Sequence, residues 1–418
     1  MTDMHVDIAI IGAGPAGIAA GIGAKEAGAG DVLVLERDWD LGGILQQCIH
    51  PGFGLHTFKE ELTGPEYMHR WIRRAHEAGV TFLTNTMVFR MESDGALWVM
   101  NPDRGVFRVV PKATVLAMGC RERPLGAINV PGGRPAGIYT AGTAQRFVNI
   151  EGYMPGRRAV ILGSGDIGLI MARRLVWEGA RVEGVFELMP WSGGLRRNIA
   201  QCIDDYGIPF YLKHAVTRIH GRDRVEGVTV TEVDERLQPV AGTERFVPCD
   251  TLLLAVGLIP ENELSCMAGV AIHPVTNGPV MNEFYQTTRP SIFAAGNVVI
   301  VYDLADWVSQ EGFAAGRNAA LYAAGSLRMP ERRIEIRGGK NVRLFSPQAI
   351  TGSSDAVIYF RVARPIEKRC RVFADHGLFE QKHRYVRPGE MNEIRLAGAD
   401  LRALPETVTT ITVDAEEA

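Results

Sequence analysis

A pattern that occurs twice constrains this chain more than any other feature: an apolar strand, three spaced glycines and the start of a helix. The first copy is VDIAIIGAGPAG at residues 6–17, and the second is RRAVILGSGDIG at residues 157–168. In such a turn the first glycine permits a tight bend, the second lets a pyrophosphate approach the backbone, and the third allows close packing of helix on strand. The helix N-terminus adds free N–H groups and partial positive charge for phosphates. The pattern therefore predicts two dinucleotide-binding units built on parallel sheets.

Each copy continues into a second apolar strand that ends in an acidic residue. The strand DVLVLE ends in Glu36, and the strand RVEGVFE ends in Glu187. Each glutamate lies 19 residues beyond the third glycine of its turn, where a carboxylate can accept hydrogen bonds from ribose hydroxyls. Because Glu187 would repel a 2′-phosphate, we expect the second site to prefer NAD(H) to NADP(H). Arg196 and Arg197 lie nearby and leave NADP(H) open.

The composition is that of a globular protein with a large core. The chain has 418 residues, of which 46% are hydrophobic and 22% charged, and its formal net charge is −3 at pH 7. Such a length suggests two or three domains. The small net charge gives no broad attraction to nucleic acid or to an anionic membrane surface, so neither is an expected partner. The apolar run at 6–24 is long enough for a membrane helix, but its Gly-Ala-Gly-Pro break favours strand, turn and helix.

Cysteine usage indicates a reducing compartment. The six cysteines are scattered without a Cys-x-x-Cys pair, at positions 48, 120, 202, 249, 266 and 370. This spacing argues against a disulfide-stapled secreted fold, and also against a zinc site or a cysteine-bound cluster in this chain. We therefore expect no metal site and a cytoplasmic location.

Further apolar segments follow in a fixed order. ATVLAMG at 113–119 and DTLLLAVGLIP at 250–260 read as strands with a glycine at or near the end, and RPSIFAAGNVV at 289–299 precedes a helix-like stretch at 307–325. From about residue 5 to 326 this succession resembles the two-dinucleotide-domain flavoproteins of the pyridine-nucleotide–disulfide oxidoreductase superfamily. The resemblance implies that the first site binds FAD through its ADP half and that the second binds NAD(P)H, here NAD(H).

The resemblance also implies an α/β fold of two Rossmann-like, three-layer domains, the second inserted in the first. We place the FAD-binding domain at 1–121 and 250–326, and the NAD(H)-binding domain at 122–249. Residues 327–418 lie beyond the shared core, and their alternating, β-branched stretches predict a small β-rich C-terminal domain. Within it, TVTTITVDAEE at 407–417 is expected to be an edge strand. We expect this domain to support packing or subunit contact rather than catalysis.

The family pattern, matched residue by residue, assigns the cofactor-binding positions. The strand end from Ala117 to Gly119 would link the two domains, and Gly296 and Asn297 would close over the flavin, with Asn297 replacing the usual aspartate. The helix that follows would direct its N-terminus at the flavin ring and stabilise the reduced, anionic flavin through its dipole. The expected cofactor-binding residues are Gly12, Gly14, Pro15, Ala16, Gly17, Glu36, Arg37, Gly42, Gly43, Ala117, Gly119, Gly163, Gly165, Asp166, Ile167, Gly168, Glu187, Gly257, Gly296 and Asn297.

Three stretches resemble a narrower group within the superfamily: GGILQQCIHPGFGLHTFKEELTGPEY, GCRERPLGAINVPGGRPAGIYTAGTAQ and ELMPWSGGLRRNIAQCIDDYGIP. The group comprises bacterial and archaeal FAD subunits associated with glycerol-3-phosphate, proline, hydroxyproline and opine dehydrogenases. Such subunits commonly work beside a second flavoprotein that oxidises the substrate. The resemblance implies a second dehydrogenase subunit or a small electron-transfer protein as partner, in a homo- or hetero-oligomer, with any iron–sulfur cluster on that partner.

One departure from the superfamily pattern bears on the chemistry. Relatives that resemble glutathione reductase have Cys-x4-Cys just after the Gly-Gly pair of the first domain, whereas Gly42 and Gly43 are followed here by Ile44 and Leu45. Relatives that resemble thioredoxin reductase have Cys-x-x-Cys before the second fingerprint, where this chain reads YTAGTAQ. Disulfide reductase activity is therefore not expected.

The loop GGILQQCIHPGFG at 42–54 occupies the place of that dithiol and contains Cys48 and His50. Its glycines fit a close approach of the backbone to the flavin. Cys48 and His50 are the catalytic candidates, as groups that line and tune the flavin ring, and a purely structural role is the alternative. Together with His56 they do not complete a tetrahedral set of metal ligands.

These features favour an FAD-dependent NAD(P)H oxidoreductase whose flavin passes electrons between NAD(H) and a second substrate or partner without a redox disulfide. The favoured form is one subunit of a multi-component dehydrogenase. The first alternative is a self-sufficient NADH-dependent flavin oxidoreductase that acts on a small molecule or a quinone. The second alternative is a nucleotide-binding assembly subunit without hydride transfer.

Overall fold

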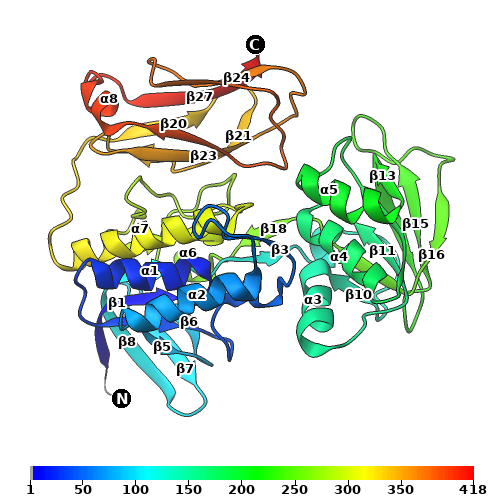
Figure 1. Cartoon of the computed structure of the whole chain (residues 1–418), viewed down its shortest axis with the longest axis horizontal. Coiled ribbons are helices and arrows are strands. Elements are labelled where there is room, and N and C mark those ends of the chain that lie inside the picture. Colours follow the sequence, from blue (N-terminus) through cyan, green and yellow to red (C-terminus); the bar gives the residue numbers. More distant parts are fainter. Residues whose placement is uncertain (1–2) are drawn as a thin grey trace. The chain divides into compact units, whose positions relative to one another are not determined.

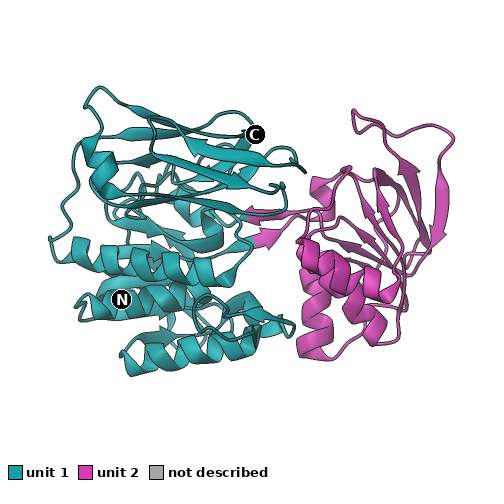
Figure 2. Ribbon diagram, turned by 45° about the horizontal axis from the view of Figure 1, so that its top comes forward, with its two compact units in different colours: residues 1–120, 260–418 teal, residues 121–259 magenta. Residues whose placement is uncertain are grey.

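The computed structural model describes residues 3–418, and the chain forms two compact units. The first unit contains the chain up to Cys120 and again from Pro260 to Ala418, and the second contains Arg121–Ile259 (Figure 2). The second unit is therefore an insertion in the first. The chain leaves and re-enters the first unit through two paired strands, β9 (Cys120–Glu122) and β18 (Leu258–Pro260).

A seven-stranded sheet forms the centre of the first unit, in the order β5-β2-β1-β8-β7-β6 with β19 also paired to β8. Strands β5, β2, β1, β8 and β19 run parallel, while β7 and β6 extend the sheet as an antiparallel meander. The last four residues of β1 are buried, as its apolar sequence predicts. The strands are β1 (Met4–Ile11), β2 (Val32–Leu35), β5 (Thr81–Leu83), β6 (Met87–Met91), β7 (Leu97–Asn101), β8 (Gly105–Leu116) and β19 (Ile292–Ala294).

Helices α1 (Pro15–Glu26) and α7 (Ala305–Ala323) lie side by side in the first unit (Figure 1). Small residues bring their backbones close together, because a Cβ on Gly312 would lie 2.1 Å from the carbonyl oxygen of Ala16. A Cβ on Gly316 would lie 1.9 Å from the carbonyl oxygen of Ala20. This contact holds the start of α1 against α7. Among the helices of residues 3–418, none combines the length and the apolar character that a membrane span needs.

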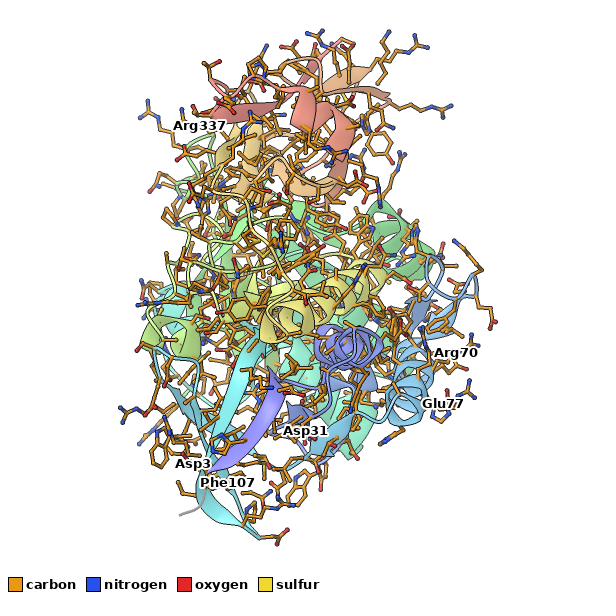
Figure 3. The ribbon with its side chains drawn as sticks, turned by 90° about the vertical axis from the view of Figure 1, so that its left-hand side faces the viewer. Asp3, Asp31, Arg70, Glu77, Phe107 and Arg337 are labelled. Carbon is orange, nitrogen blue, oxygen red and sulfur yellow. The ribbon has the colours of Figure 1, made fainter. Side chains whose placement is uncertain are left out.

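Helix α2 (Gly64–Glu77) separates a buried face from a charged one. It begins with a capping box, in which Thr63 accepts the N–H of Glu66 and Glu66 accepts the N–H of Thr63. Tyr67 is fully buried, whereas Arg70 and Glu77 lie at the periphery of the molecule (Figure 3). Arg70 forms a surface ion pair at 2.6 Å with a nearby glutamate, so the charge on this helix is solvated and locally paired.

The second unit repeats the strand–turn–helix arrangement. Its parallel sheet has the order β10-β17-β11-β12-β13, and a separate antiparallel sheet has the order β14-β15-β16. The elements are β10 (Ile138–Thr140), α3 (Ala141–Arg146), β11 (Arg158–Leu162), α4 (Asp166–Trp177), β12 (Arg181–Glu187), α5 (Arg196–Cys202), β13 (Phe210–Leu212), β14 (His214–His220), β15 (Gly227–Glu232), β16 (Arg245–Pro248) and β17 (Thr251–Leu254).

The division between the units differs from the boundary expected between residues 249 and 250. In β17, Leu252 aligns with Ile138 of β10 on one side and with Val160 of β11 on the other. Pairing on both sides places this strand in the second unit. The difference has a simple physical origin. A parallel strand that is buried on both faces reads as a continuous apolar run in either sheet, so its sequence does not say which sheet it joins.

The C-terminal segment builds two small sheets around a core of its own, which includes Ile358, Phe360 and Ile411. The expectation that residues 407–417 form an edge strand is wrong. Strand β27 pairs with β20 on one side and with β24 on the other, so it is central. The elements are β20 (Ile334–Gly338), β21 (Val342–Ser346), β22 (Ala349–Ile350), β23 (Ala356–Val362), β24 (Cys370–Ala374), β25 (Phe379–His383), β26 (Asn392–Leu396), α8 (Gly398–Ala403) and β27 (Thr410–Glu417).

This C-terminal segment is fastened to the loop that follows β19. Arg361 of β23 forms an ion pair with Asp303, and it donates a second bond to the carbonyl oxygen of Val301 at 3.2 Å. The other carboxylate oxygen of Asp303 accepts the N–H of Met391 at 2.6 Å. Two separate parts of the C-terminal segment thus hold one loop of the parallel-sheet domain.

Candidate functional site

The first glycine turn, residues 12–17, joins β1 to α1 and leaves no room for a side chain at two of its glycines. Gly12 has φ 101°, and a Cβ there would lie 2.6 Å from the carbonyl oxygen of Ala117. A Cβ on Gly17 would lie 1.8 Å from the carbonyl oxygen of Gly12. Glycine is required at both positions, at Gly12 for the left-handed backbone as well as for space.

Gly14, the middle glycine of the turn, faces open space instead. It is the N-cap residue of α1, no side chain caps the helix, and a Cβ on Gly14 would meet no atom within 4 Å. Pro15 begins the helix, which has 12 residues. The first N–H groups and the positive end of the helix dipole therefore meet unfilled space. This cradle fits the phosphate groups of a dinucleotide.

Glu36, at the end of β2, fixes the first glycine turn from the side. One carboxylate oxygen accepts the N–H of Ala13 at 2.7 Å, and the other accepts the N–H of Asp38 at 2.8 Å. The side chain is 7% exposed, whereas that of Arg37 is exposed. Glu36 thus orients the backbone of the turn. This role does not depend on a hydrogen bond between its carboxylate and a ribose hydroxyl.

The second glycine turn, residues 163–168, repeats this geometry between β11 and α4. Gly163 has φ 92°, and a Cβ there would lie 2.3 Å from the carbonyl oxygen of Ala255. A Cβ on Gly168 would lie 2.6 Å from the Cβ of the same alanine. The middle glycine, Gly165, is again an N-cap residue without a side-chain cap, and the nearest atom to its Cβ position is 3.5 Å away. The second turn therefore offers a second phosphate cradle.

Glu187 fixes the second glycine turn as Glu36 fixes the first. One carboxylate oxygen accepts the N–H of Ser164 at 2.9 Å and its hydroxyl at 2.5 Å, and the other accepts the N–H of Met189 at 2.9 Å. In both units the acid therefore bonds the second residue of its turn and the residue two positions beyond itself. The predicted acids occupy equivalent places.

A glycine pair that starts six residues after each acid extends the repeat. The N–H of Gly42 donates to the carbonyl oxygen of Ala13 at 2.9 Å. The N–H of Gly193 donates to the hydroxyl of Ser164 at 2.8 Å. Each pair closes over the second residue of its turn. Only the first pair is among the predicted cofactor-binding residues, although an alignment of the two copies beyond the acid also indicates the second.

Asp166 is the clearest difference between the two turns, because it begins α4 where Pro15 begins α1. Its Oδ1 atom accepts the N–H of Leu195 at 2.8 Å and the side-chain amide of Asn198 at 2.6 Å. The carboxylate therefore bonds the segment after the second glycine pair rather than capping its own helix.

The predicted residues Ala117, Gly119 and Gly257 lie in different units. Ala117 is joined to the end of β1 by a bond from its N–H to the carbonyl oxygen of Ile11 at 3.0 Å, and Gly119 has φ 73° with open space around its Cβ position. Both belong to the first unit. Gly257 belongs to the second unit, where its carbonyl oxygen accepts the N–H of Arg123 at 3.0 Å.

The loop after β19 approaches the first glycine turn. A Cβ on Gly296 would lie 3.0 Å from the Cβ of Ala16, in the first turn of α1. The Oδ1 atom of Asn297 accepts the N–H of Tyr302 at 3.0 Å, and its Nδ2 atom donates to the Sγ atom of Cys120 at 3.7 Å. The structure thus brings Gly296 to the first turn and Asn297 to Cys120.

The two catalytic candidates lie in a loop that is partly buried. Burial raises the pKa of the Cys48 thiol to about 12, and its Sγ–H donates to the carbonyl oxygen of Ile44 at 3.4 Å. The ring of His50 is half-buried and lies 5.2 Å from the ring of Phe53, centroid to centroid. The thiolate form of Cys48 is therefore scarce near neutral pH.

This loop is anchored by a buried acid, Asp306, that is not among the predicted site residues. Asp306 is 2% exposed on α7, and its carboxylate accepts the N–H of Gly54 at 3.2 Å and the N–H of Thr57 at 2.8 Å. The partners are about 250 residues apart in the chain, so no local pattern could have indicated them. Within residues 3–418, no disulfide joins any two of the six cysteines. No group of three or more His, Cys, Asp or Glu side chains in that range is placed to hold a metal ion.

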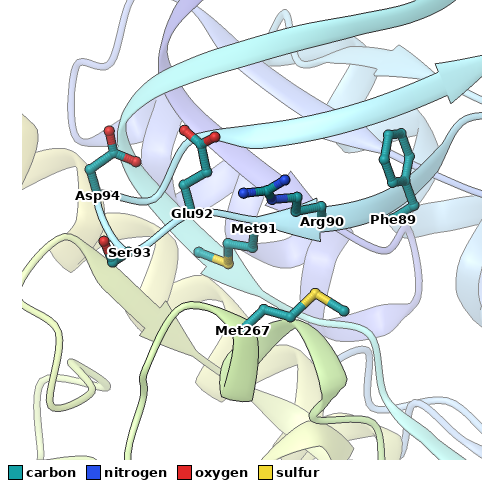
Figure 4. Close-up of a pocket in the computed structure, with 7 residues that line it drawn as sticks. All are labelled: Phe89, Arg90, Met91, Glu92, Ser93, Asp94 and Met267. Carbon is teal, nitrogen blue, oxygen red and sulfur yellow. The ribbon is translucent and has the colours of Figure 1, made fainter.

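A hollow of about 720 Å³ lies at the end of β6 beside α6 (Glu263–Met267) (Figure 4). Its acids, Glu92 and Asp94, both contact Arg108, at 2.7 and 3.8 Å. None of the predicted site residues lines this hollow. Its lining residues are Phe89, Arg90, Met91, Glu92, Ser93, Asp94 and Met267.

Two glycine turns, each fixed by an acid beside a parallel sheet, define a protein with two dinucleotide-binding domains. A family model described as pyridine nucleotide-disulphide oxidoreductase matches residues 6–323. The chain belongs to this family, whose members bind FAD and NAD(P). The expected superfamily and the expected α/β fold are therefore confirmed, and the protein is an oxidoreductase of the flavoprotein class.

Two curated relatives are named as subunits. The chain is 25% identical over 319 residues to HcnB, a hydrogen cyanide synthase subunit of Pseudomonas protegens, and the match covers 71% of this chain. It is 28% identical over 347 residues to an opine oxidase subunit of Agrobacterium tumefaciens, and that match covers 77% of this chain. In each case the match spans 66% of the relative, just under two thirds of its length.

A solved structure shows the same fold. The thioredoxin reductase of T. acidophilum matches with a TM-score of 0.62 and 22% identity, over 77% of this chain and 99% of that protein. At such an identity the likeness concerns the fold, and the chemistry has to be argued from the residues of this chain.

Proposed function

We propose that this chain is an FAD-dependent oxidoreductase that passes electrons between NAD(H) and a second substrate or protein partner, as one subunit of a multi-component dehydrogenase. One observation carries the proposal. In each glycine turn the outer glycines are packed against neighbouring atoms, while the middle glycine, Gly14 or Gly165, faces open space at the N-terminus of a 12-residue helix. One chain therefore offers cradles for two dinucleotides.

The residues that would hold each cofactor follow from these contacts. FAD would be held by the first glycine turn, Glu36, the pair Gly42-Gly43 and the loop at Gly296-Asn297. NAD(H) would be held by the second glycine turn and Glu187. When both are bound, the cofactors supply hydride transfer between nicotinamide and flavin. The part of the protein is to bind and orient them, which requires no protein acid or base.

Charge at the second turn supports NAD(H) over NADP(H). Glu187 is 9% exposed and keeps its carboxylate beside the place where a ribose would follow the cradle. A 2′-phosphate there would meet that negative charge. Arg196 and Arg197 are exposed on α5, and they are the side chains that could offset the repulsion.

Electrons would leave the flavin by a route other than a protein disulfide. Cys48 is the cysteine that follows the first glycine pair, and with its pKa raised to about 12 it holds little thiolate for disulfide exchange. The two relatives that are named as subunits support a protein partner. We propose that this partner is a second dehydrogenase subunit or a small electron-transfer protein.

Anaerobic titration of the purified chain with NADH tests the proposal. The protein should be yellow, NADH should bleach the flavin absorbance, and rapid reoxidation should require an added partner. Protein that takes up no FAD would overturn the proposal. Rapid reoxidation by a small quinone alone would instead support a self-sufficient enzyme. Flavin that stays oxidised with NADH, but is reduced once a partner and its substrate are present, would remove NAD(H) from the reaction.

A further inference from the structure

A buried carboxyl group lies behind the loop that contains Asn297. Glu311 belongs to α7 and is 2% exposed. Its carboxylate accepts the hydroxyl of Tyr302 at 2.6 Å and the N–H of Gly296 at 3.2 Å. Burial raises its pKa to about 7, and among residues 3–418 it forms no ion pair. The group is therefore poised between its two charge states near neutral pH.

The same loop fixes the orientation of the Asn297 amide. The Oδ1 atom is held by the N–H of Tyr302, within the loop, and the Nδ2 atom is directed at the Sγ atom of Cys120. Turning the amide over would place two N–H donors against each other and lose the bond to Tyr302. Asn297 therefore presents its NH₂ group, not its oxygen, on the side of Cys120.

Within the described chain, the surroundings of Glu311 offer no cation to balance a second negative charge. The phenols of Tyr302 and Tyr359 pack edge to face at 5.1 Å, and burial raises the pKa of both. Helix α1 meets α7 through alanine and glycine. Arg395 is already paired with Glu393 at 3.2 Å. The titratable groups that interact with Glu311 are Tyr285, Tyr302 and Tyr359, and these tyrosines interact in turn with Glu393 and Arg395.

We propose that Glu311 is a positioning residue for the flavin site. Through Gly296 and Tyr302 it fixes the loop so that Asn297 offers a neutral N–H donor to the bound cofactor, and it makes a negative charge at position 297 unfavourable. The inference rests on the proposed function, because it takes FAD as the ligand that Asn297 meets. Its physical basis is that Glu311 bonds the N–H of Gly296, the residue next to position 297, and that like charges close together at a partly buried site repel each other.

A double-mutant cycle tests the coupling of the two positions. Asn297→Asp keeps the side-chain shape and the acceptor for Tyr302 but adds a charge, and Glu311→Gln removes the other charge. We expect Asn297→Asp to weaken FAD binding about tenfold at pH 8 and far less at pH 6, where Glu311 is mostly protonated. In the double variant this dependence on pH should disappear. The measurements are the Kd for FAD added to apoprotein and the thermal midpoint of the apoprotein, at both pH values.

Each outcome of these measurements either supports or overturns the inference. A loss of FAD affinity in Asn297→Asp that is equal at pH 6 and pH 8, or that persists unchanged beside Glu311→Gln, overturns the inference. If Asn297→Asp alone fails to fold, the double variant must recover folding, and its failure to do so also overturns the inference. If the wild-type chain binds no FAD, the proposed function fails, while the thermal midpoints still report whether a charge at 297 is penalised through Glu311.

Discussion

The two glycine turns share their spacing but differ in what packs against them. In the first, the third glycine lies against the backbone of the turn itself, with 1.8 Å between the Cβ position of Gly17 and the oxygen of Gly12. In the second, the Cβ position of Gly168 is closest to the side chain of Ala255, at 2.6 Å. The middle glycines of both turns are open. The comparison separates two roles of one motif: the outer glycines allow close packing, and the middle glycine leaves the space that we propose a cofactor phosphate fills.

The largest expected effect is on stability, from an added methyl group at the third glycine. Gly17→Ala pushes a Cβ into a backbone carbonyl that cannot move aside, so we expect a loss of about 3 kcal/mol or more in the free energy of unfolding. Gly168→Ala meets the Cβ of Ala255 at 2.6 Å, a less severe overlap than that at Gly17, and we expect a smaller loss of about 1–2 kcal/mol. Urea unfolding of both variants measures the difference. Equal losses would contradict the distinction between the two turns.

The next effect is on binding, from a side chain at the middle glycine. Because Gly14 and Gly165 face open space with φ −76° and −62°, valine should be accommodated within about 1 kcal/mol of the wild-type stability. Gly14→Val should lower FAD affinity by about 100-fold or more, since the side chain fills the phosphate cradle. Gly165→Val should leave the flavin bound and remove its reduction by NADH.

The two valine variants are controls for each other. Flavin content and thermal midpoint are measured for both, followed by anaerobic NADH titration. A Gly14→Val protein that is yellow, or a Gly165→Val protein that NADH bleaches at the wild-type concentration, would show that these turns are not the cofactor cradles.

How far the sequence could predict the molecule follows from the range of the interactions. The turns and their acids were predictable, because strand, turn, helix and acid lie within about 35 residues and each leaves a local pattern. The bonds from Asp306 to Gly54 and Thr57, and from Glu311 to Gly296 and Tyr302, are set by the packing of α7. Nothing in the residues around either acid indicates such partners.

Sheet membership was the other limit. Strand β17 reads as a buried strand whichever sheet it joins, and β27 has the alternating burial of a strand with one covered face. Alternation reports which face is covered, but not how many neighbours a strand has. The sequence therefore predicted both strands and left open which neighbours they would have.

The titration of Glu311, in the first unit, should have a smaller effect on the free energy of unfolding. Burial raises its pKa from 4.5 to about 7, so between these values the folded chain binds more protons than the unfolded chain. The stability that Glu311 contributes is present below the unfolded pKa and is lost as the pH rises through 7. The change amounts to about 2–3 kcal/mol. Glu311→Gln cannot titrate, so relative to wild type it should gain about that much between pH 5 and pH 8.

Urea unfolding of the apoprotein at a series of pH values checks this. Parallel stability curves for wild type and Glu311→Gln across that range would mean that Glu311 titrates normally. The loop at Gly296, which lies against the first glycine turn, would then not be held by an acid whose charge changes near neutral pH.

A modest change in specificity should follow from the acid of the second turn. Glu187→Gln keeps an acceptor for the N–H of Ser164 and removes the charge that a 2′-phosphate would meet. We expect kcat/KM for NADPH relative to NADH to rise about tenfold. The same change at Glu36 should leave this ratio as it is, since Glu36 belongs to the other turn. An unchanged ratio in Glu187→Gln would show that the charge of Glu187 does not set the preference for NADH.

The smallest effect is expected from replacing Cys48. If its thiol took part in redox chemistry, this replacement would have the largest effect. Cys48 lies five residues after the second glycine of its pair, and Ile199 holds the corresponding place in the second unit. The shared position suggests that an apolar contact is what both loops need there. Cys48→Ala removes only a buried sulfur, for which we expect a loss of about 1 kcal/mol in stability. Because the raised pKa keeps the thiol protonated, reduction of the flavin by NADH should stay within about twofold of wild type. A loss of two orders of magnitude would establish a redox role for the thiol and reopen disulfide chemistry.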